Sequence, residues 1–452
     1  MDTTTLENNN DESSSPPPAL PSASSSSFFS MNELFKLPEG SEKTVSGWVG
    51  AIRDIGRVVF VVLRDASGSV QTVASNKFCT PELIELARGL HQEDLLSITG
   101  IITKNPQVAG GAELRIKNIN VIARAKNPLP LDPSGKVDAN FDTRLDNRVL
   151  DLRNHRVSDV FILKSRLLFE CHEHFMKHGF IQVNTPKIVA TGAEGGSTLF
   201  PINYYNREAY LTQSPQLYKQ MLMASGLRRV YEIAPAWRAE KSHTTRHVSE
   251  FVSVDAEMAF IENEEDVMRV IEGLVKHLVS STPADIVERF GQAMPKLEFP
   301  RITYEKACSM LGIPFGADLS SEAERELGTL MKKEQDADFY FITGYPSEVK
   351  PFYVMVEKDN PQICKAFDLE FRGLEILSGA QREHRPELLR ERMKELGIEP
   401  LGFESYIAAF EHGMPPHGGF GLGIERFIEE LLGLGNVREA VLFPRDCERL
   451  AP

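Results

Sequence analysis

Residues 251–260 read Phe-Val-Ser-Val-Asp-Ala-Glu-Met-Ala-Phe, and apolar and polar side chains alternate along the run. Alternation with a period of two is typical of a half-buried β-strand, with Val252, Val254 and Ala256 on one face. The run 369–375 alternates in the same way. Few strand–helix–strand alternations separate such runs, so the sequence favours an α+β domain with helices flanking an antiparallel sheet over a doubly wound parallel sheet.

The sequence before this sheet predicts a linker and one long helix. Apolar residues recur at a spacing of four, and the pattern ends at Gly179, a residue type that commonly ends helices. Three prolines and a charged run mark residues 126–155, which we interpret as an interdomain hinge, so that the second domain spans 156–452. The apolar positions of the helix are Leu163, Leu167, Cys171 and Phe175.

Residues 33–125 predict a small β-barrel. Five short runs are rich in strand-forming residues, and Thr80-Pro81, between the third and fourth runs, provides an N-cap and a proline at the first position of a helix. Five strands with a helix after the third is the arrangement of an OB-fold, which often binds oligonucleotides. The runs are 45–52, 58–63, 70–74, 95–102 and 114–123.

Length and composition restrict the class of protein. A chain of 452 residues exceeds one compact core, so we expect two domains with extensions. The net charge of −14 argues against a sequence-independent nucleic-acid binder, and five scattered cysteines without metal-ligand spacing fit a reducing compartment. Residues 1–32 form a Ser/Pro-rich tail that we expect to be disordered, and its lack of basic residues argues against a targeting signal. We therefore expect a cytoplasmic protein with no membrane span.

Two segments carry groups suited to phosphate binding. Arg238 and Arg246 enclose a polar loop ahead of Phe251, so the arginines could hold a phosphate while the ring stacks on a base. A solvated surface hairpin would have the same sequence. The run 418–426 combines glycines with a helix start, which offers backbone N–H groups, but the sequence contains neither a P-loop nor a dinucleotide fingerprint.

Two carboxylates form a third candidate group. Asp368 and Glu375 offer oxygen ligands of the kind that Mg²⁺ prefers when it bridges nucleotide phosphates. Residues seven apart fall on opposite faces of one strand, so both reach one site only if a turn or bulge lies between them. Solvated strand carboxylates are the alternative interpretation.

Taken in order, these segments resemble the three signature motifs of the class II aminoacyl-tRNA synthetases, and most closely those of the aspartyl-tRNA synthetases of the archaeal and eukaryotic cytosolic type. Residues 179–187 resemble motif 1, whose proline, Pro186 here, lies at the family's dimer interface. Residues 238–258 resemble motif 2 and 421–426 motif 3. The resemblance extends from about Lys43 to the end of the chain. Its most specific segments are 214–219 (Ser-Pro-Gln-Leu-Tyr-Lys), 378–382 (Ser-Gly-Ala-Gln-Arg) and 442–446 (Leu-Phe-Pro-Arg-Asp).

The resemblance implies binding sites for ATP, aspartate and Mg²⁺, and among the ATP residues it implies catalytic roles for Arg238, Glu240 and Arg426. The implied ATP-binding residues are Arg238, Ala239, Glu240, Arg246, His247, Val248, Phe251, Glu375, Gly423, Ile424, Glu425 and Arg426. The implied aspartate-binding residues are Glu194, Gln216, Lys219, Arg238, Tyr353, Ser378 and Arg382. The implied Mg²⁺ ligands are Asp368, Glu375 and Ser378.

The activity implied by the resemblance is that of an aspartate–tRNA ligase. Such an enzyme joins L-aspartate to ATP as aspartyl-adenylate and transfers the aspartyl group to the 3′ end of tRNA(Asp), with tRNA(Asn) as a second candidate acceptor. Two cations, Lys219 and Arg382, converging on one short carboxylate would favour aspartate over neutral asparagine. The family also implies a homodimer.

In the barrel, the resemblance assigns anticodon binding to Arg53, Phe60 and Gln71, because an exposed ring beside polar groups is how single-stranded RNA is usually recognised. Core packing of Phe60 is the competing interpretation. The tail is acidic, unlike the Lys-rich extensions of many eukaryotic relatives, which keeps open an aspartate-activating paralogue with a non-tRNA acceptor. A binding protein without catalysis is disfavoured, because it has no chemical need for the complete set of charged residues.

Overall fold

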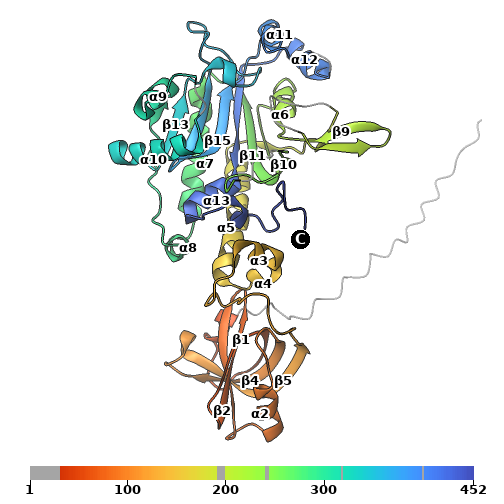
Figure 1. Cartoon of the computed structure of the whole chain (residues 1–452), viewed down its shortest axis with the longest axis vertical. Helices are drawn as coiled ribbons and strands as arrows, with labels where there is room; N and C mark the ends of the chain where they lie inside the picture. The colour runs from red at the N-terminus through yellow and green to blue at the C-terminus, as the bar shows by residue number, and fades with distance from the viewer. Residues whose placement is uncertain (1–30, 191–198, 240–243, 317–318, 400–401) are drawn as a thin grey trace, which may run out of the picture. The chain divides into compact units, whose positions relative to one another are not determined.

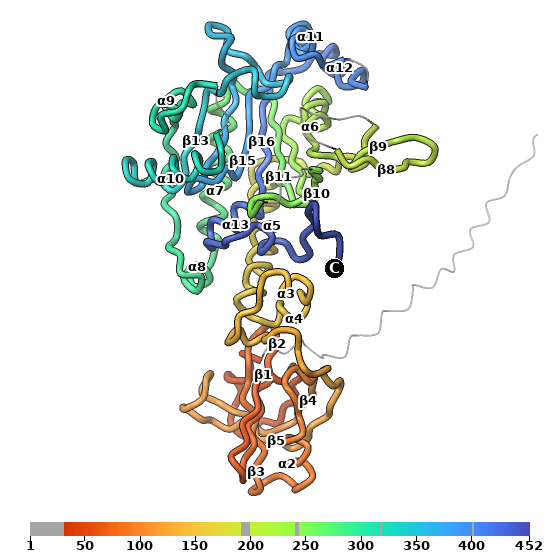
Figure 2. Tube along the Cα trace, viewed as in Figure 1, coloured from red at the N-terminus to blue at the C-terminus, as the bar shows by residue number. Residues whose placement is uncertain are grey.

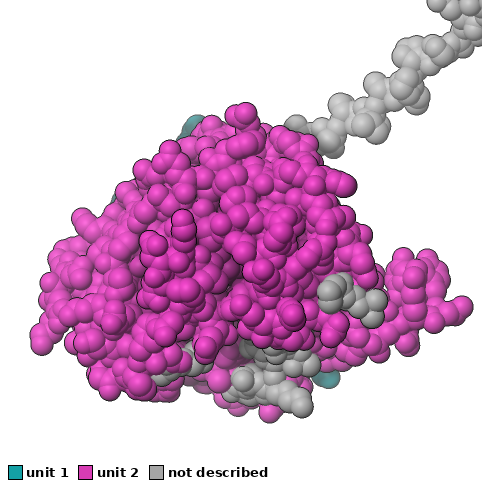
Figure 3. All heavy atoms as spheres, turned by 90° about the horizontal axis from the view of Figure 1, so that it is seen from above, with its two compact units in different colours: residues 1–129 teal, residues 130–452 magenta. Residues whose placement is uncertain are grey.

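The computed structural model of the protein describes residues 31–190, 199–239, 244–316, 319–399 and 402–452. It divides into two compact units, residues 1–129 and 130–452 (Figure 3). Nearly all of the predicted tail, residues 1–30, lies outside the described residues. Met31 is buried in the core of the first unit, so the folded barrel begins two residues before the predicted boundary at 33.

The first unit is the predicted OB-fold. Its five strands form a closed barrel in the order β1-β2-β3-β5-β4, with a helix after the third strand. The hydroxyl of Thr80 accepts a hydrogen bond from the backbone N–H of Leu83, and Pro81 is the first helical residue, as expected. The elements are α1 (Met31–Leu34), β1 (Glu42–Asp54), β2 (Val58–Asp65), β3 (Gly68–Ser75), α2 (Pro81–Arg88), β4 (Leu95–Lys104), η1 (Ala109–Gly111) and β5 (Ala112–Ala123).

The second half of the predicted hinge is a folded part of the second unit. Residues of this segment form two short helices, α3 (Phe141–Asp146) and α4 (Arg148–Asp151). The buried Arg148 donates hydrogen bonds to the backbone carbonyls of Val441 (2.9 Å) and Leu442 (3.0 Å), near the other end of the chain. A hinge extending to residue 155 is therefore wrong, because a buried guanidinium with this many partners fixes the segment to its unit.

The second unit is built on an eight-stranded sheet in the order β12-β13-β14-β15-β16-β11-β10-β6 (Figures 1 and 2). The pairings are antiparallel except β12 with β13 and β10 with β6, which agrees with the predicted antiparallel sheet. The strands are β6 (Ile181–Gln182), β10 (Arg229–Trp237), β11 (Glu250–Ala259), β12 (Arg301–Thr303), β13 (Phe339–Thr343), β14 (Ala366–Phe371), β15 (Leu374–Gln381) and β16 (His417–Gly423). A smaller sheet holds β7 (Ile188–Val189), β8 (Pro201–Tyr204) and β9 (Arg207–Leu211).

Helices cover this sheet and bury its core. The four predicted apolar positions of α5 are fully buried against α7 and the sheet, and Gly179, with a φ of 75°, follows the helix end. The helices are α5 (His155–Lys177), α6 (Gln216–Met223), α7 (Glu264–Ser281), α8 (Ala284–Arg289), α9 (Tyr304–Leu311), α10 (Ser321–Gln335), α11 (Pro386–Glu395), α12 (Glu404–Glu411) and α13 (Ile424–Leu432), with short turns η2 (Ser347–Val349) and η3 (Val437–Ala440). Among the described residues, no helix is long and apolar enough to cross a membrane.

The run 369–375, expected as one strand, is a hairpin. Phe371 of β14 pairs with Leu374 of β15, which leaves Arg372 and Gly373 as a two-residue turn. Both turn residues have positive φ, 52° and 84°, as the favoured hairpin turn requires. The alternation of polar and apolar residues continues across the turn, so the sequence pattern alone could not locate it.

Candidate functional site

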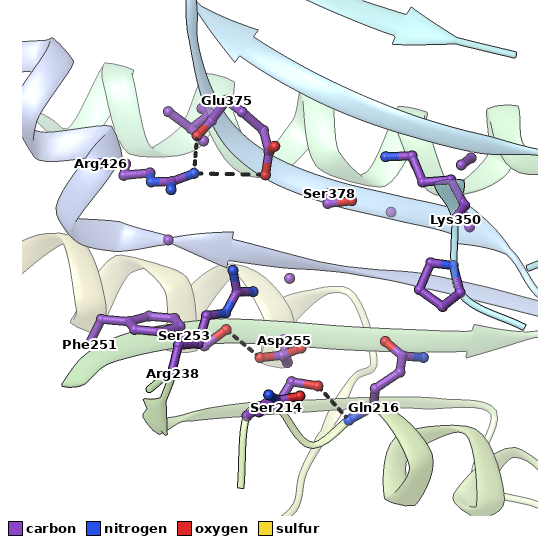
Figure 4. A pocket seen from close by; sticks show the side chains of 18 of the residues that line it. Ser214, Gln216, Arg238, Phe251, Ser253, Asp255, Lys350, Glu375, Ser378 and Arg426 are labelled. Carbon is purple, nitrogen blue, oxygen red and sulfur yellow. Dashed lines mark hydrogen bonds and ion pairs between the residues drawn. The ribbon is translucent and has the colours of Figure 1, made fainter. Parts of the chain in front are cut away.

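A cavity of about 420 Å³ lies over strands β11, β15 and β16 of the second unit (Figure 4). Most of the residues expected to bind ATP or aspartate line it, although they come from several separate segments of the chain. The lining residues among those predicted are Arg238, Arg246, His247, Val248, Phe251, Glu375, Gly423, Glu425 and Arg426 for ATP, and Gln216, Tyr353, Ser378 and Arg382 for aspartate. The structure therefore brings the three segments of the sequence analysis to one site.

One end of the cavity carries arginines held by neighbouring backbone. Arg426, in the first turn of α13, donates from Nη1 to the backbone carbonyl of Glu375 (3.0 Å), and its guanidinium lies 3.8 Å from the Glu375 carboxylate. The Arg238 guanidinium lies 5.5 Å from the centre of the Phe251 ring. A cation beside a half-buried ring that lines the cavity, and a second cation across it, could hold a phosphate chain and a stacked base.

Two residues of the motif 3 run differ in their relation to the cavity. Ile424 is fully buried in the apolar core and does not line the cavity, so its side chain cannot contact a nucleotide there. Glu425 borders the cavity, but its Oε1 accepts from the Lys164 ammonium (2.7 Å) and from the Val252 backbone N–H (3.0 Å). The expectation for Ile424 is therefore wrong for its side chain, because successive helical residues point in different directions.

The opposite end of the cavity rests on a buried group of two cations and two carboxylates. Arg382 donates from Nε to Glu257 (3.0 Å) and from Nη2 to the Gln216 side chain (3.1 Å). Lys219 donates to Asp255 (2.9 Å) and to the carbonyl of Phe420 (2.8 Å). Burial alone would raise the pKa of Glu257, but the charges of Arg382 and Lys219 lower it, so the carboxylate is ionised.

The structure alters the expectation for Lys219. Arg382 and Asp255 line the cavity, whereas Lys219 does not and is only 2 % exposed. The Lys219 ammonium lies beneath Asp255 and is already paired with it. The two predicted cations therefore do not converge on open space: Arg382 can meet a ligand directly, and in this conformation Lys219 acts through the carboxylate of Asp255.

The three predicted Mg²⁺ ligands lie on the β14–β15 hairpin. Asp368 and Ser378 are register partners on the two strands, and Glu375 and Ser378 line the cavity. Asp368 does not line it; its Oδ2 pairs with Lys350 (2.7 Å), while its buried Oδ1 has no hydrogen-bond partner among the described residues. A buried oxygen without a partner beside a half-exposed carboxylate fits a divalent cation, and the hairpin supplies the turn that the sequence required.

Lys350 and Asp255 are the main site residues that the sequence analysis missed. Lys350 lines the cavity, pairs with Asp368 and lies 3.8 Å from the centre of the Tyr345 ring. The only available signal was its position as the single cation in the largely apolar run 345–356. Asp255 was placed on the polar face of its strand, but no spacing rule connects it with Lys219, 36 residues earlier.

Two expected site residues cannot be placed. Glu194 and Glu240 lie outside the described residues. Ala239 is described but does not line the cavity.

The predicted anticodon residues lie together on the outer face of the barrel. Arg53 is the register partner of Phe60, and its guanidinium lies 5.3 Å from the ring centre. Arg53 also donates to the Gln71 side chain (3.4 Å), which in turn donates to Glu113 (3.0 Å). Phe60 is half-buried and is not part of the barrel core, whereas its neighbours Val59 and Val61 are fully buried. The competing interpretation, core packing of Phe60, is therefore wrong.

Known protein families match both units. The family of class II tRNA synthetases (D, K and N) matches residues 140–447, and the OB-fold nucleic acid binding domain matches residues 43–122. The chain is 49 % identical to the aspartate–tRNA(Asp) ligase of Pyrococcus horikoshii over 431 residues, which are 93 % of this chain and 98 % of the relative. It is 46 % identical to the aspartate–tRNA(Asp/Asn) ligase of Methanothermobacter thermautotrophicus, over 92 % of this chain and 96 % of the relative.

Solved structures of aminoacyl-tRNA synthetases also match the fold of this chain. Asparaginyl-tRNA synthetase of Pyrococcus horikoshii, in complex with asparaginyl-adenylate, superposes with a TM-score of 0.86 at 33 % identity, covering 92 % of this chain and 97 % of that one. Aspartyl tRNA synthetase of Entamoeba histolytica superposes with a TM-score of 0.84 at 31 % identity, covering 94 % and 92 %.

Proposed function

Because the chain belongs to the class II aminoacyl-tRNA synthetases as an aspartate–tRNA ligase, we propose that this cavity is where L-aspartate is activated by ATP and passed to tRNA(Asp). The observation that carries the proposal is the division of the cavity into two ends. Arginines from two separate elements stand at one end, and a charge-balanced buried group supports Arg382 at the other. The first suits a triphosphate and the second a short dicarboxylic amino acid.

At the ATP end, Phe251 stacks on adenine and Arg238 contacts both the α-phosphate and the substrate carboxylate. Arg426 and Arg246 neutralise the outer phosphates, with His247 and Val248 beside them. The substrate carboxylate attacks the α-phosphorus, and pyrophosphate leaves. No covalent nucleophile is required, because positioning and charge neutralisation lower the barrier of this step. The cation–ring contact between Arg238 and Phe251 supports these roles.

At the aspartate end, Arg382 holds the side-chain carboxylate, with Gln216, Ser378 and Tyr353 completing the pocket. The Arg382 guanidinium uses Nε and Nη2 for Glu257, Gln216 and a backbone carbonyl, and Nη1 takes part in none of these bonds. A fixed guanidinium with a remaining N–H edge is suited to a carboxylate and less suited to the amide of asparagine.

Enzymes of this class generally use ATP with Mg²⁺, and we assign Asp368, Glu375 and Ser378 as the residues that would hold it. When bound, Mg²⁺ offsets phosphate charge during transfer. Lys350 pairs with Oδ2 of Asp368 at 2.7 Å, and the buried Oδ1, which has no hydrogen-bond partner among the described residues, remains for a cation.

In the barrel, the face formed by Arg53, Phe60 and Gln71 binds the anticodon. A half-buried ring with a guanidinium 5.3 Å away offers a stacking platform, and the Gln71 amide can read a base edge. Relatives named as aspartate–tRNA(Asp) ligases and relatives named as aspartate–tRNA(Asp/Asn) ligases have similar identity to this chain, so tRNA(Asn) is a second candidate acceptor.

We also propose that the protein is a cytoplasmic homodimer that associates through α5 and the chain that follows it. Ile162, Phe169 and Met176, spaced by seven residues along one side of α5, are 49 %, 59 % and 69 % exposed. Ile181 of β6 is 49 % exposed, and Pro186 is also exposed. A row of large apolar side chains of this length is characteristic of an interface between subunits. Sedimentation of Phe169→Glu tests it: a dimer that persists in this variant contradicts the assignment.

Two assays test the function. Aspartate-dependent exchange of pyrophosphate into ATP measures activation alone, and charging of purified tRNA(Asp) and tRNA(Asn) side by side measures transfer. We expect exchange with aspartate but not asparagine, and a charged product with tRNA(Asp). Exchange without any charged tRNA would instead support an aspartate-activating enzyme with another acceptor.

A further inference from the structure

Arg246 is held from outside the cavity by a helix that the sequence analysis did not connect with ATP. The Arg246 guanidinium lines the cavity, and its Nη1 forms an ion pair with Glu324 in the first turns of α10. Its Nη2 donates to the backbone carbonyl of Gly373 in the β14–β15 turn (3.2 Å). A guanidinium has five N–H donors, so donors remain for a ligand after these two contacts.

The position of Glu324 is fixed by backbone packing between α10 and this turn. A Cβ atom on Gly328 would lie 2.6 Å from the backbone nitrogen of Gly373, and one on Gly373 would lie 2.6 Å from the backbone oxygen of Glu324. Only glycine at both positions allows this approach. The turn that carries the Gly373 carbonyl and the helix that carries the Glu324 carboxylate are therefore one rigid support, and Arg246 is attached to both.

Glu324 lies close to other carboxylates, and Arg246 is one of the two cations that offset their charge. The side chains of Arg246 and Glu324 are 9 % and 15 % exposed. Burial and the charge of Glu375 on β15 raise the pKa of Glu324, while Arg246 and Arg426 on α13 oppose the shift. Glu370 on β14 and Tyr340 on β13 also face this group. Removing Arg246 would leave Glu324 beside other carboxylates with less opposing charge. The ion pair therefore holds both side chains in place: Glu324 orients Arg246, and Arg246 offsets the charge of Glu324.

We propose that Glu324 is a positioning residue for ATP: with the carbonyl of Gly373, its carboxylate holds Arg246 so that the remaining N–H groups face the phosphates. Glu324 does not line the cavity, so we assign its effect to its ion pair with Arg246. The inference rests on the proposed function, since it assigns Arg246 to the phosphate end of the same site. A guanidinium fixed before binding loses less side-chain freedom when the phosphates arrive.

The test is pyrophosphate exchange with Glu324→Gln in the full chain. The amide keeps the shape of the side chain but removes the charge, so Arg246 is held less firmly. We expect KM for ATP to rise roughly tenfold, equivalent to about 1.4 kcal/mol, with KM for aspartate changed less than about twofold. Glu326→Gln, the same change at an exposed position of α10, is the matched control and should leave both values unchanged.

A second comparison separates positioning from a general effect on the fold. In an Arg246→Met background, Glu324→Gln should raise KM for ATP no further, because the residue through which it acts is gone. If the two effects multiply, or if Glu324→Gln behaves like Glu326→Gln, the inference is overturned. Glu324→Asp, which keeps the charge on a shorter stem, should give an intermediate KM and serves if the amide variant does not fold. Absence of aspartate-dependent exchange in the unmodified protein would instead refute the proposed function.

Discussion

Replacing Lys219 with Met tests the buried charge group beneath the aspartate end. Lys219 pairs with Asp255 at 2.9 Å and lies 3.6 Å from Glu257, and all three side chains are at most 4 % exposed. Removing one partner of a buried ion pair leaves an uncompensated charge, which costs about 3–5 kcal/mol. We expect the second unit to unfold at a temperature lower by roughly 6–10 °C, as measured by differential scanning calorimetry.

The same substitution should alter substrate affinity selectively. Lys219 and Arg382 balance Asp255 and Glu257, so losing Lys219 changes the net charge of this group from zero to −1. One unit charge at roughly 7 Å, with an effective dielectric constant of about 20, is worth about 2 kcal/mol, or roughly thirtyfold in KM. In the proposed function the second carboxylate of aspartate lies at this end of the cavity, so KM for aspartate should rise far more than KM for ATP.

A charge-balanced variant provides the control. Lys219→Met combined with Asp255→Asn removes one cation and one carboxylate, so most of the lost thermal stability should return. If Lys219 acts only through the charge of Asp255, KM for aspartate also recovers; if it contacts aspartate directly after a rearrangement, it does not. Equal increases of KM for aspartate and ATP in the single variant, or no loss of stability, would refute the reasoning.

Three further predictions follow from buried groups and from the barrel face. Gly328→Ala places a methyl group 2.6 Å from the backbone nitrogen of Gly373, so it should cost about 1–3 kcal/mol in a denaturant titration. Burial lowers the pKa of His174 and of His417 to about 4 from 6.5, so both are neutral when folded. Each neutral histidine therefore contributes its full share to the free energy of unfolding above pH 6.5. This share falls by about 1.4 kcal/mol per pH unit as the pH decreases from 6.5 toward 4, because the unfolded chain binds the proton first. We expect His174→Gln to reduce the pH dependence of the free energy of unfolding in this range. Phe60→Ala should weaken tRNA binding by about 1–3 kcal/mol while pyrophosphate exchange stays unchanged, because it removes only a stacking platform.

Local patterns were sufficient to predict the barrel strands and several elements of the second unit. Strand alternation predicted β11, the apolar spacing of four predicted α5, and Thr80-Pro81 predicted the start of α2. These features depend on residues close in sequence, where a period or a cap has one structural meaning. The β14–β15 hairpin was missed because a two-residue turn leaves the alternation intact, and the hinge was drawn too long because the partners of Arg148 lie almost 300 residues away.

The sequence analysis named candidate site residues but could not indicate which of them contact one another. Resemblance identified Arg382, Lys219 and Arg426, since each stands in a distinctive run. It could not indicate that Lys219 lies beneath Asp255 or that Lys350 and Glu324 support the site from other elements. Those relations depend on sheet register and on helix packing, which bring residues together without any shared sequence spacing.

Strand β16 contributes to both ends of the cavity, through its glycines at one end and through the helix that follows it at the other. Glycines stand at 418, 419, 421 and 423, where the lack of a side chain allows a ligand or a neighbouring group to approach the backbone. At Gly421 and Gly423 this agrees with the cavity lining, but a Cβ on Gly419 would lie 2.2 Å from Oε2 of Glu257. Gly419 therefore makes room for the carboxylate that holds Arg382, and its own carbonyl accepts from the same guanidinium (3.0 Å). Because β16 runs directly into α13, whose first turn carries Arg426, the strand that makes room for Glu257 and Arg382 also sets the position of Arg426 at the other end of the cavity.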